Sequence, residues 1–350
     1  MIRNNIEEQY LDLLRDILEN GVNKGDRTGT GTISVFGRQI RHDMSLGFPL
    51  LTTKKMGFKN IKTELAWFLA GRTDLRFLLE NNCHIWVGDA YKNYLTKMDE
   101  HFVGGGDLAT KELFIELIKT DDEFAKEWGD LGPIYGHQWR HWGPSNVVDG
   151  YIPGYTGQIK GVLKTLSENP DSRRIMVNAW NVEDIDKMTL APCHYGFQVY
   201  TTELSKDERY NYWFRNNYET GMERNYDNIP DYDNHYYEKT PTRRISLMWN
   251  QRSVDTPLGL PYNIASYALL LHLLASEMNM IPDELIGNLG DTHIYSNQIE
   301  GVKKQLERVP MKLPSIEIMD GMYSSLSYDS DDVRLVGYES HPTIKFPLSN

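Results

Sequence analysis

The sequence predicts an α+β protein in one large domain, with helices packed on a central mixed β-sheet. Segments with the two-residue alternation of strands and segments with helical periodicity are mixed along the chain without a regular β-α-β rhythm, which argues against a doubly wound sheet. The chain has 350 residues, of which 40% are hydrophobic, and this is enough for a sizeable core. No internal repeat or low-complexity tract divides it, so we expect a single domain over residues 1–350.

The individual elements follow from their local patterns. Apolar residues at helical spacing through residues 6–18 predict a first helix that ends at Gly21. The same reasoning predicts helices at 60–71, 262–279 and 294–308 and strands at 31–43, 174–180, 195–202 and 244–252. The last three strands are expected to belong to one central sheet. The segment 262–279 is apolar on most faces and is expected to be the core helix beneath it.

Two stretches differ in character and are interpreted as insertions, at about 98–129 and 206–240. The first is acidic, contains the run Gly104–Gly106 and has one helical pattern at 111–119. The second holds seven of the 21 tyrosines and lies between two predicted strands that could otherwise pair through a short turn. Its composition favours a packed surface lobe over a binding role.

The composition limits the function classes. The formal net charge of −12 argues against a broad basic face that clamps DNA or RNA, and against docking on anionic membranes. The longest apolar stretch, 262–280, is interrupted by Asn263 and Glu277, which is typical of a buried helix and not of a membrane span. No signal sequence is apparent, and Cys83 and Cys193 are the only cysteines, so we expect a cytoplasmic protein without a disulfide framework.

Cys193 is a candidate nucleophile. It lies just before a predicted strand, where Pro192 restricts the backbone, and nearby cations or helix N-termini can favour its thiolate form. Because neighbouring residues in a strand point to opposite faces, His194 is not expected to be its base, which counts against a Cys–His protease. A buried, inert cysteine is the alternative interpretation.

Four arginines lie in or beside predicted turns. Arg27 is in a glycine-rich turn, Arg173 and Arg174 open a strand, and Arg252 precedes Ser253 at the end of another. Arginine binds phosphate in a bidentate manner, with support from hydroxyl and backbone N–H groups, so these residues predict a local anion site. Four independent salt bridges with the surplus carboxylates are the open alternative.

Other polar residues lie in apolar or extended segments. Glu64 is surrounded by apolar residues on a predicted helix, where a carboxyl can have a raised pKa and transfer protons, unless it is simply solvated or salt-bridged. His293 and Tyr295 share one face of an extended segment, where both could bind a hydroxyl. Asn263, at the start of an apolar helix, either caps the helix or recognises the hydrogen-bond donors and acceptors along one edge of a ligand. No HExxH, CxxC or Walker pattern supports a metal or ATP mechanism.

Long motifs in this chain together resemble the folate-dependent thymidylate synthase family. They are DRTGTGT (26–32), FPLLTTKK (48–55), TELAWFLAG (63–71), DLGPIYGHQWR (130–140), DSRRIMVNAWN (171–181), APCH (191–194), NQRSVDTPLGLPYNIASYALL (250–270) and GDTHIYSNQ (290–298). They follow the order of the family and cover nearly all of the chain outside the two predicted insertions. The deoxypyrimidine hydroxymethylases of some phages share the same scaffold.

The resemblance implies a role for each matching residue. Cys193 matches the nucleophile that adds to C6 of a pyrimidine, and Asn263 matches the residue that reads the uracil O4/N3 edge. The implied nucleotide-binding set is Arg27, Arg173, Arg174, Gln251, Arg252, Ser253, Asn263, His293 and Tyr295. The implied folate-binding set is Trp86, Asp255, Leu258, Gly259 and Tyr262, and the residues that organise water and proton transfer are Glu64, Tyr135 and His194. Arg173 and Arg174 match a pair contributed across the interface of a homodimer.

The implied activity is the reductive methylation of dUMP to dTMP with 5,10-methylenetetrahydrofolate as co-substrate and no metal. The alternative is a hydroxymethylase that makes 5-hydroxymethyl-dUMP, and a minor alternative is an inactive nucleotide- or RNA-binding regulator. Asn263, where a cytosine-specific enzyme would carry Asp, favours dUMP, and the presence of Trp86 and Leu190 favours reduction. The expected partners are dUMP, folate and a second copy of the chain, without DNA or membrane.

Some positions depart from the family pattern. Val87 stands where an acidic residue usually follows the tryptophan, and Gly57 replaces a larger folate-contacting side chain. Gln298 stands where His is common, and the chain ends in Ser349–Asn350 where a small apolar residue is usual. These departures concern folate contacts and the exclusion of water from the site.

Overall fold

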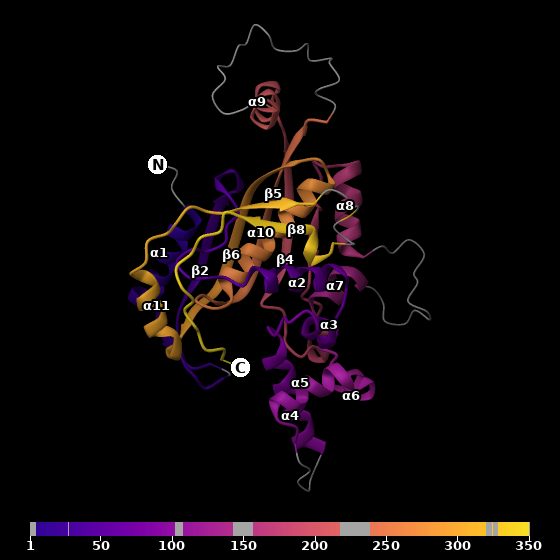
Figure 1. Ribbon diagram of the computed structural model, residues 1–350, viewed down its shortest axis with the longest axis vertical. Coiled ribbons are helices and arrows are strands. Elements are labelled where there is room, and N and C mark those ends of the chain that lie inside the picture. Colours follow the sequence, from indigo (N-terminus) through magenta and orange to yellow (C-terminus); the bar gives the residue numbers. More distant parts are fainter. Residues whose placement is uncertain are drawn as a thin grey trace.

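A single six-stranded mixed sheet forms the centre of the computed structural model, which describes residues 5–26, 28–101, 108–142, 157–217, 239–319, 324 and 328–349 (Figure 1). Its strands, in spatial order, are β1 (Val22–Lys24), β2 (Thr32–Asp43), β6 (Ile281–Tyr295), β5 (Arg243–Asp255), β4 (His194–Glu203) and β3 (Met176–Asn178). Strands β5 and β6 pair in parallel and all other neighbours are antiparallel. The predicted α+β class with a mixed central sheet is therefore confirmed.

Helix α10 (Leu260–Glu277) is the core helix under this sheet. It packs on β5 and β6, and its side chains are buried around most of its circumference. Tyr267 of α10 stacks on Trp249 of β5, with ring centroids 5.4 Å apart. Gly287 of β6 permits this packing, because an added Cβ would lie 2.4 Å from the Trp249 indole. Within the described ranges, no helix has the length and apolarity needed to cross a bilayer.

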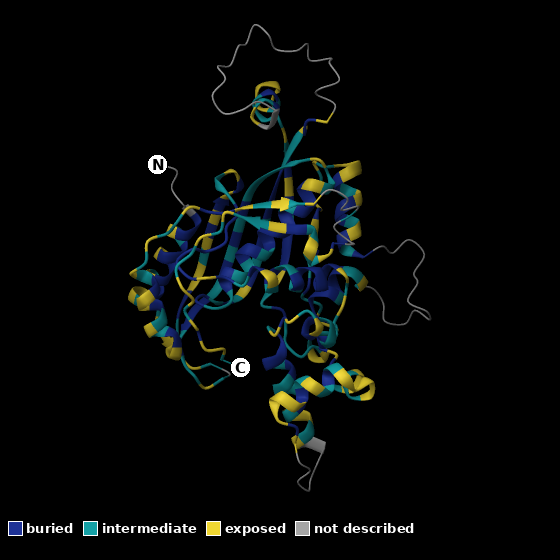
Figure 2. Ribbon diagram, viewed as in Figure 1, coloured by how far each residue is buried: buried dark blue, intermediate teal, exposed yellow. Residues whose placement is uncertain are grey.

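Helix α1 (Asn5–Asn20) covers the β2 side of the sheet, as its periodicity predicted. Tyr10 is fully buried and its hydroxyl donates to the Thr256 carbonyl. Glu7 is also buried, and its carboxylate accepts the N–H groups of Thr52 and Thr53. These bonds tie α1 to the segment that leads into α2 (Phe58–Leu69). Buried residues gather between the sheet and the helices at the centre of the molecule (Figure 2).

The remaining elements surround this core. They are α3 (Leu75–Glu80), α4 (Val87–His101), α5 (Lys111–Thr120), α6 (Asp122–Trp128), α7 (Tyr135–His141), α8 (Gln158–Glu168), α9 (Lys206–Asn217), α11 (Ile299–Leu306), β7 (Ser315–Ile318) and β8 (Val333–Val336). Helix α7 packs on α2 and α8. Helices α4, α5 and α6 extend from one end of the molecule and α9 lies at the opposite end (Figure 1).

The two stretches interpreted as insertions occupy these two ends. Helices α5 and α6 lie in the first stretch, and aromatic contacts such as Tyr94–Trp128, at 5.1 Å between centroids, hold them to α4. The second stretch begins with α9, and residues 218–238 lie outside the described residues. Strands β4 and β5 on either side of it pair directly, with Glu203 opposite Arg243. That pairing was expected, and the interpretation of both stretches as insertions stays a prediction.

The strand predicted at 174–180 is shorter, at Met176–Asn178, and a second helix, α6, follows the helix predicted at 111–119. The largest difference from the sequence prediction lies at 281–308. Residues 281–295 form β6, the longest strand, of which only the extended segment around His293 was foreseen. The helix expected at 294–308 begins at Ile299, because Ile294 and Tyr295 still belong to β6. Pro282, two adjacent acidic residues and two glycines obscure the alternation of this strand, and only its long-range pairing with β2 and β5 reveals it.

Candidate active site

A cavity of about 510 Å³ lies where the ends of β4, β5 and β6 meet. Its lining includes six of the predicted site residues, namely Cys193, Arg252, Ser253, Asp255, His293 and Tyr295. Asp26 and Thr28 of the glycine-rich turn and Leu348 near the chain end also line it. The sheet thus brings together residues that are far apart in the sequence. A concave site of this size, lined by a few converging polar groups, is typical of a small-molecule binding site.

The Arg252 side chain holds the loop that carries Cys193. Its Nε donates to the Pro192 carbonyl and an Nη donates to the Ala191 carbonyl, each at 2.9 Å. The Arg252 backbone N–H donates to the Cys193 carbonyl at 2.8 Å. A guanidinium has five N–H donors, so Arg252 can fix this loop and also bind an anion in the cavity.

Aromatic and polar groups pack behind Cys193. Its backbone N–H donates to the Tyr135 hydroxyl at 2.8 Å, and the Tyr135 ring stacks on His194 with centroids 4.3 Å apart. The Nδ1 of His194 lies 2.8 Å from the Tyr267 hydroxyl. Burial lowers the pKa of His194 to about 3, so its imidazole stays neutral. The predicted residues Tyr135 and His194 therefore support the loop of Cys193.

Glu64 lies on α2 beside Trp86. The Trp86 indole Nε1 donates to Glu64 Oε1 at 2.8 Å. Burial raises the pKa of Glu64 to about 7, against the smaller lowering effect of the Trp86 bond. Glu64 is partly buried, and no ion pair to it occurs among the described side chains, so the salt-bridged alternative is not what the structure shows. A carboxyl with a pKa near 7 can both donate and accept protons at neutral pH.

The amide of Asn263 is oriented by two successive hydrogen bonds, from Trp249 to Gln251 and from Gln251 to Asn263. The Trp249 indole Nε1, which can only donate, lies 3.2 Å from Gln251 Oε1 and so sets the orientation of the Gln251 amide. Gln251 Nε2 then donates to Asn263 Oδ1 and to the Ser253 carbonyl, both at 3.1 Å. Gln251 is buried, and its hydrogen bond to Oδ1 fixes the orientation of the Asn263 amide. The Nδ2 group of Asn263 then remains as a donor for a ligand.

His293 is oriented by an acidic neighbour that the sequence analysis missed. Its Nδ1 lies 3.2 Å from Asp291 Oδ1, and Lys24 Nζ donates to Asp291 Oδ2 at 2.7 Å. The His293 ring also packs edge-on against Tyr295, with centroids 5.0 Å apart. Because Nδ1 faces Asp291, Nε2 is the ring nitrogen available to a ligand. Strand alternation places Asp291 and His293 on one face, and this signal was present in the sequence.

Asp255 is a half-buried carboxyl in the wall of the cavity. The Leu258 N–H donates to its Oδ1 at 3.1 Å, and Gln298 Nε2 lies 3.2 Å from its Oδ2. Burial raises the pKa of Asp255, and these two hydrogen bonds oppose that effect. The Gly259 N–H donates to the Asp255 carbonyl at 2.9 Å, and Tyr262 follows on α10 near Gly57. Gln298 was noted in the sequence only as a departure from the family pattern.

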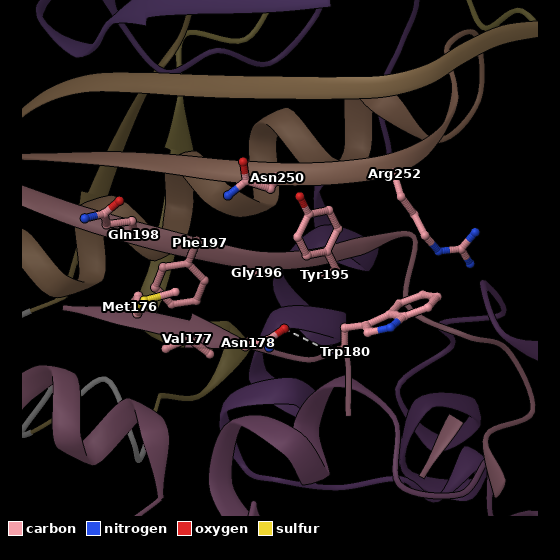
Figure 3. A pocket seen from close by; sticks show the side chains of 10 residues that line it. All are labelled: Met176, Val177, Asn178, Trp180, Tyr195, Gly196, Phe197, Gln198, Asn250 and Arg252. Carbon is pink, nitrogen blue, oxygen red and sulfur yellow. Dashed lines mark hydrogen bonds between the residues drawn. The ribbon is translucent and has the colours of Figure 1, made fainter. Parts of the chain in front are cut away.

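The other predicted residues lie away from the cavity or outside the described residues. Arg27 belongs to the latter group. Arg173 and Arg174 are exposed at the entrance to β3 and do not line the cavity. A second hollow of about 430 Å³ lies on the adjoining face of β3, β4 and β5, and Figure 3 shows Tyr195, Asn250 and Arg252 among the side chains around it.

Comparisons with known proteins agree with the geometry. The sequence model of a family described as thymidylate synthase matches residues 8–350. Two curated proteins named thymidylate synthase, from Listeria monocytogenes serotype 4a (strain HCC23) and serotype 4b (strain F2365), are each 40% identical over 359 aligned positions. Each alignment covers 98% of this chain and 99% of the relative.

Proposed function

The chain belongs to the thymidylate synthase family, and on that premise we propose that it converts dUMP to dTMP with 5,10-methylenetetrahydrofolate as co-substrate. The observation that carries this proposal is the placement of Cys193 in one cavity with Arg252, Ser253 and His293. These groups match the parts of a deoxynucleoside monophosphate, with a cation and a hydroxyl for the phosphate and an imidazole for the sugar hydroxyl. The names of the relatives do not favour the hydroxymethylase alternative.

Cys193 is the proposed nucleophile. Carbon C5 of uracil is a weak nucleophile, and addition of the Cys193 thiolate to C6 converts C5 into an enolate carbon that can form a bond to the one-carbon unit. Positive charge from Arg252 favours the thiolate. The Nδ2 amide of Asn263, oriented by Gln251, stabilises the oxygen on which negative charge develops. When the C6–S bond breaks, Cys193 is regenerated.

Glu64 is the proposed proton-transfer group around the base. Its pKa of about 7 allows it to exchange protons with water near the pyrimidine at neutral pH. Tyr135 and His194 hold the loop of Cys193 and, because His194 is neutral, they add no charge that would compete for the nucleotide phosphate. Trp86 keeps the Glu64 carboxyl in place through its indole N–H.

The residues at one end of the cavity fit a folate. Asp255 offers a half-buried acceptor for the N–H donors of a pterin ring, and Leu190 and Leu348 supply apolar walls. When bound, 5,10-methylenetetrahydrofolate supplies a one-carbon unit and a hydride. Leu258 and Gly259 fix Asp255 through the backbone, and Tyr262 is expected to contribute to the same wall.

A homodimer is part of the proposal. Arg173 and Arg174 match phosphate-binding residues of the family, yet they are exposed and remote from the cavity of their own chain. The face of the sheet opposite α10 also carries exposed apolar side chains, and Tyr200 on it is 67% exposed. Contact between two such faces would cover these side chains and bring the arginines of one copy to the cavity of the other.

The domain organisation and the cellular compartment are also part of the proposal. We propose that residues 1–350 form one catalytic domain, with the stretches at about 98–129 and 206–240 as insertions. The protein is proposed to act in the cytoplasm, because both cysteines are free thiols in the structure, which suits a reducing compartment.

The product of the reaction tests this function. The protein is incubated with dUMP and 5,10-methylenetetrahydrofolate, and both products are identified by mass. We expect methylated nucleotide and dihydrofolate. Hydroxymethylated nucleotide with tetrahydrofolate would instead establish the hydroxymethylase, and dUMP binding without turnover would support the regulator.

A further inference from the structure

The C-terminal segment forms part of the cavity wall. Leu348 and Ser349 line the cavity beside Asp255. Upstream of them, Phe346 is 9% exposed, and Lys54 Nζ lies 4.8 Å from the centroid of its ring. The apolar side chain of Phe346 therefore packs the segment against the rest of the protein.

The packing position of the Phe346 ring depends on a glycine of α11. A Cβ added at Gly301 would lie 2.5 Å from a ring carbon of Phe346, so the ring packs directly on the helix backbone. The Lys54 ammonium that covers the ring also donates to the Pro257 carbonyl, which ties Lys54 to the turn after Asp255. The first anchor of the segment thus reaches the same turn that holds the Asp255 carboxyl.

Gln298 supplies the second anchor. Its Nε2 lies 3.3 and 3.2 Å from the two carboxylate oxygens of Asp255 and 3.1 Å from the Pro347 carbonyl. Its orientation is set by the Tyr295 backbone N–H, which donates to Gln298 Oε1 at 3.1 Å. Gln298 is 1% exposed, so these bonds are shielded from water. A weaker contact between Asn297 and Ser349, at 3.4 Å, lies nearby.

We propose that Gln298 is a positioning residue that joins Asp255 to Pro347 and holds the C-terminal segment in the cavity wall. Breaking this link frees the segment and removes a donor from the Asp255 carboxyl at the same time.

The consequence for catalysis rests on the proposed function. After the one-carbon unit has bonded to C5, removal of the C5 proton breaks the bond between that unit and the nitrogen of tetrahydrofolate, and the pyrimidine is left with an exocyclic methylene group. A hydride from the bound tetrahydrofolate reduces it to methyl and leaves dihydrofolate, whereas addition of water gives hydroxymethyl and leaves tetrahydrofolate without any redox change. A seated segment, with Leu348 in the wall, excludes that water.

The seating is tested first without ligands. The full-length protein is digested with a carboxypeptidase, and the release of Leu348 is followed by mass. Loss of a shielded hydrogen bond predicts about tenfold faster release from Gln298→Leu than from wild type. Gln305→Leu is the matched control, because Gln305 is a buried glutamine of α11 that donates to Thr53 and makes no hydrogen bond to residues 346–349 among the described side chains.

A second variant displaces the segment without touching Gln298. Gly301→Ala favours the helix, so the protein is expected to fold, while the new Cβ pushes Phe346 out of its packing position. It should also release Leu348 faster than wild type. Equal release rates for wild type, Gln298→Leu and Gln305→Leu would overturn the proposal, whatever the activity of the protein.

The catalytic consequence is tested by product partition. With dUMP and 5,10-methylenetetrahydrofolate, Gln298→Leu and Gly301→Ala should both raise the hydroxymethyl-to-methyl product ratio and raise KM for the folate more than KM for dUMP. Gln305→Leu should leave the ratio unchanged. Unchanged ratios in both seating variants would overturn the water-exclusion step. If wild type forms neither product, the proposed function fails, and the digestion result still decides the role of Gln298.

Discussion

Replacing Gln251 should change which pyrimidine the site prefers. Uracil presents an acceptor at O4 and a donor at N3, whereas cytosine presents a donor at N4 and an acceptor at N3. An Asn263 amide matches one base in one orientation and the other base when it is flipped. Because Trp249 orients Gln251, and Gln251 Nε2 donates to Asn263 Oδ1, the structure holds Asn263 in a single orientation.

The size of the effect follows from this hydrogen bond. Flipping Asn263 in the wild-type protein would exchange the Gln251–Asn263 bond for two facing N–H donors, at a cost of about 1.5–2 kcal/mol. At about 1.4 kcal/mol for each factor of ten, Gln251 accounts for roughly a ten- to thirtyfold preference for the uracil orientation. Gln251→Leu removes the preference, and Gln251→Glu, whose carboxylate accepts but does not donate, favours the flipped amide.

The assay is the ratio of Kd values for dUMP and dCMP, measured by calorimetry so that turnover is not required. Gln251→Leu should lower the discrimination about tenfold, and Gln251→Glu should lower it further. Both variants keep Asn263 itself, so any change reports on its orientation. Discrimination equal to wild type in Gln251→Glu would refute the orientation of Asn263 by Trp249 through Gln251.

Two other changes test the electrostatics of the site. Glu64→Gln should lower kcat by about a hundredfold or more, as expected for loss of a general acid–base group, with little change in Kd for dUMP. Burial raises the pKa of Glu64 from 4.5 to about 7, so ionising it costs the folded protein stability as pH rises through this interval. The free energy of unfolding, measured with urea, should therefore rise in Glu64→Gln relative to wild type by up to about 3 kcal/mol between pH 4.5 and pH 7.5. If the difference in free energy between the two proteins is the same at both pH values, the pKa of Glu64 is not raised. Asp291→Asn should raise KM for dUMP about three- to tenfold with little change in kcat, because a neutral partner orients His293 less firmly; equal effects on kcat would place Asp291 in the chemistry instead.

Much of the core was predictable because local pattern and burial coincide there. The apolar run of α10 and the alternation in β4 and β5 specify their own secondary structure, and Glu64 was identified from its apolar neighbours. The Cys193 loop and the residues of β5 were found as long motifs. These features depend on residues that are close together in the sequence or that form a continuous motif.

The parts that were missed depend on distant partners. Strand β6 has no clean alternation, and its pairing with β2 and β5 defines it. Lys24 meets Asp291, and Gln298 meets both Asp255 and Pro347, across separations that no local pattern encodes. Such contacts orient side chains that line the cavity, so the sequence pointed to cavity-lining residues more readily than to the residues that support them.

The central claim is that Cys193 adds covalently to C6 of dUMP in this cavity. The most direct measurement is intact-protein mass after incubation with 5-fluoro-dUMP and 5,10-methylenetetrahydrofolate, followed by peptide mapping. A fluorine at C5 cannot leave as a proton does, so the adduct should accumulate, and the modified peptide should contain Cys193 and disappear in Cys193→Ser. An adduct that persists in Cys193→Ser, or that maps to Cys83, would contradict the account.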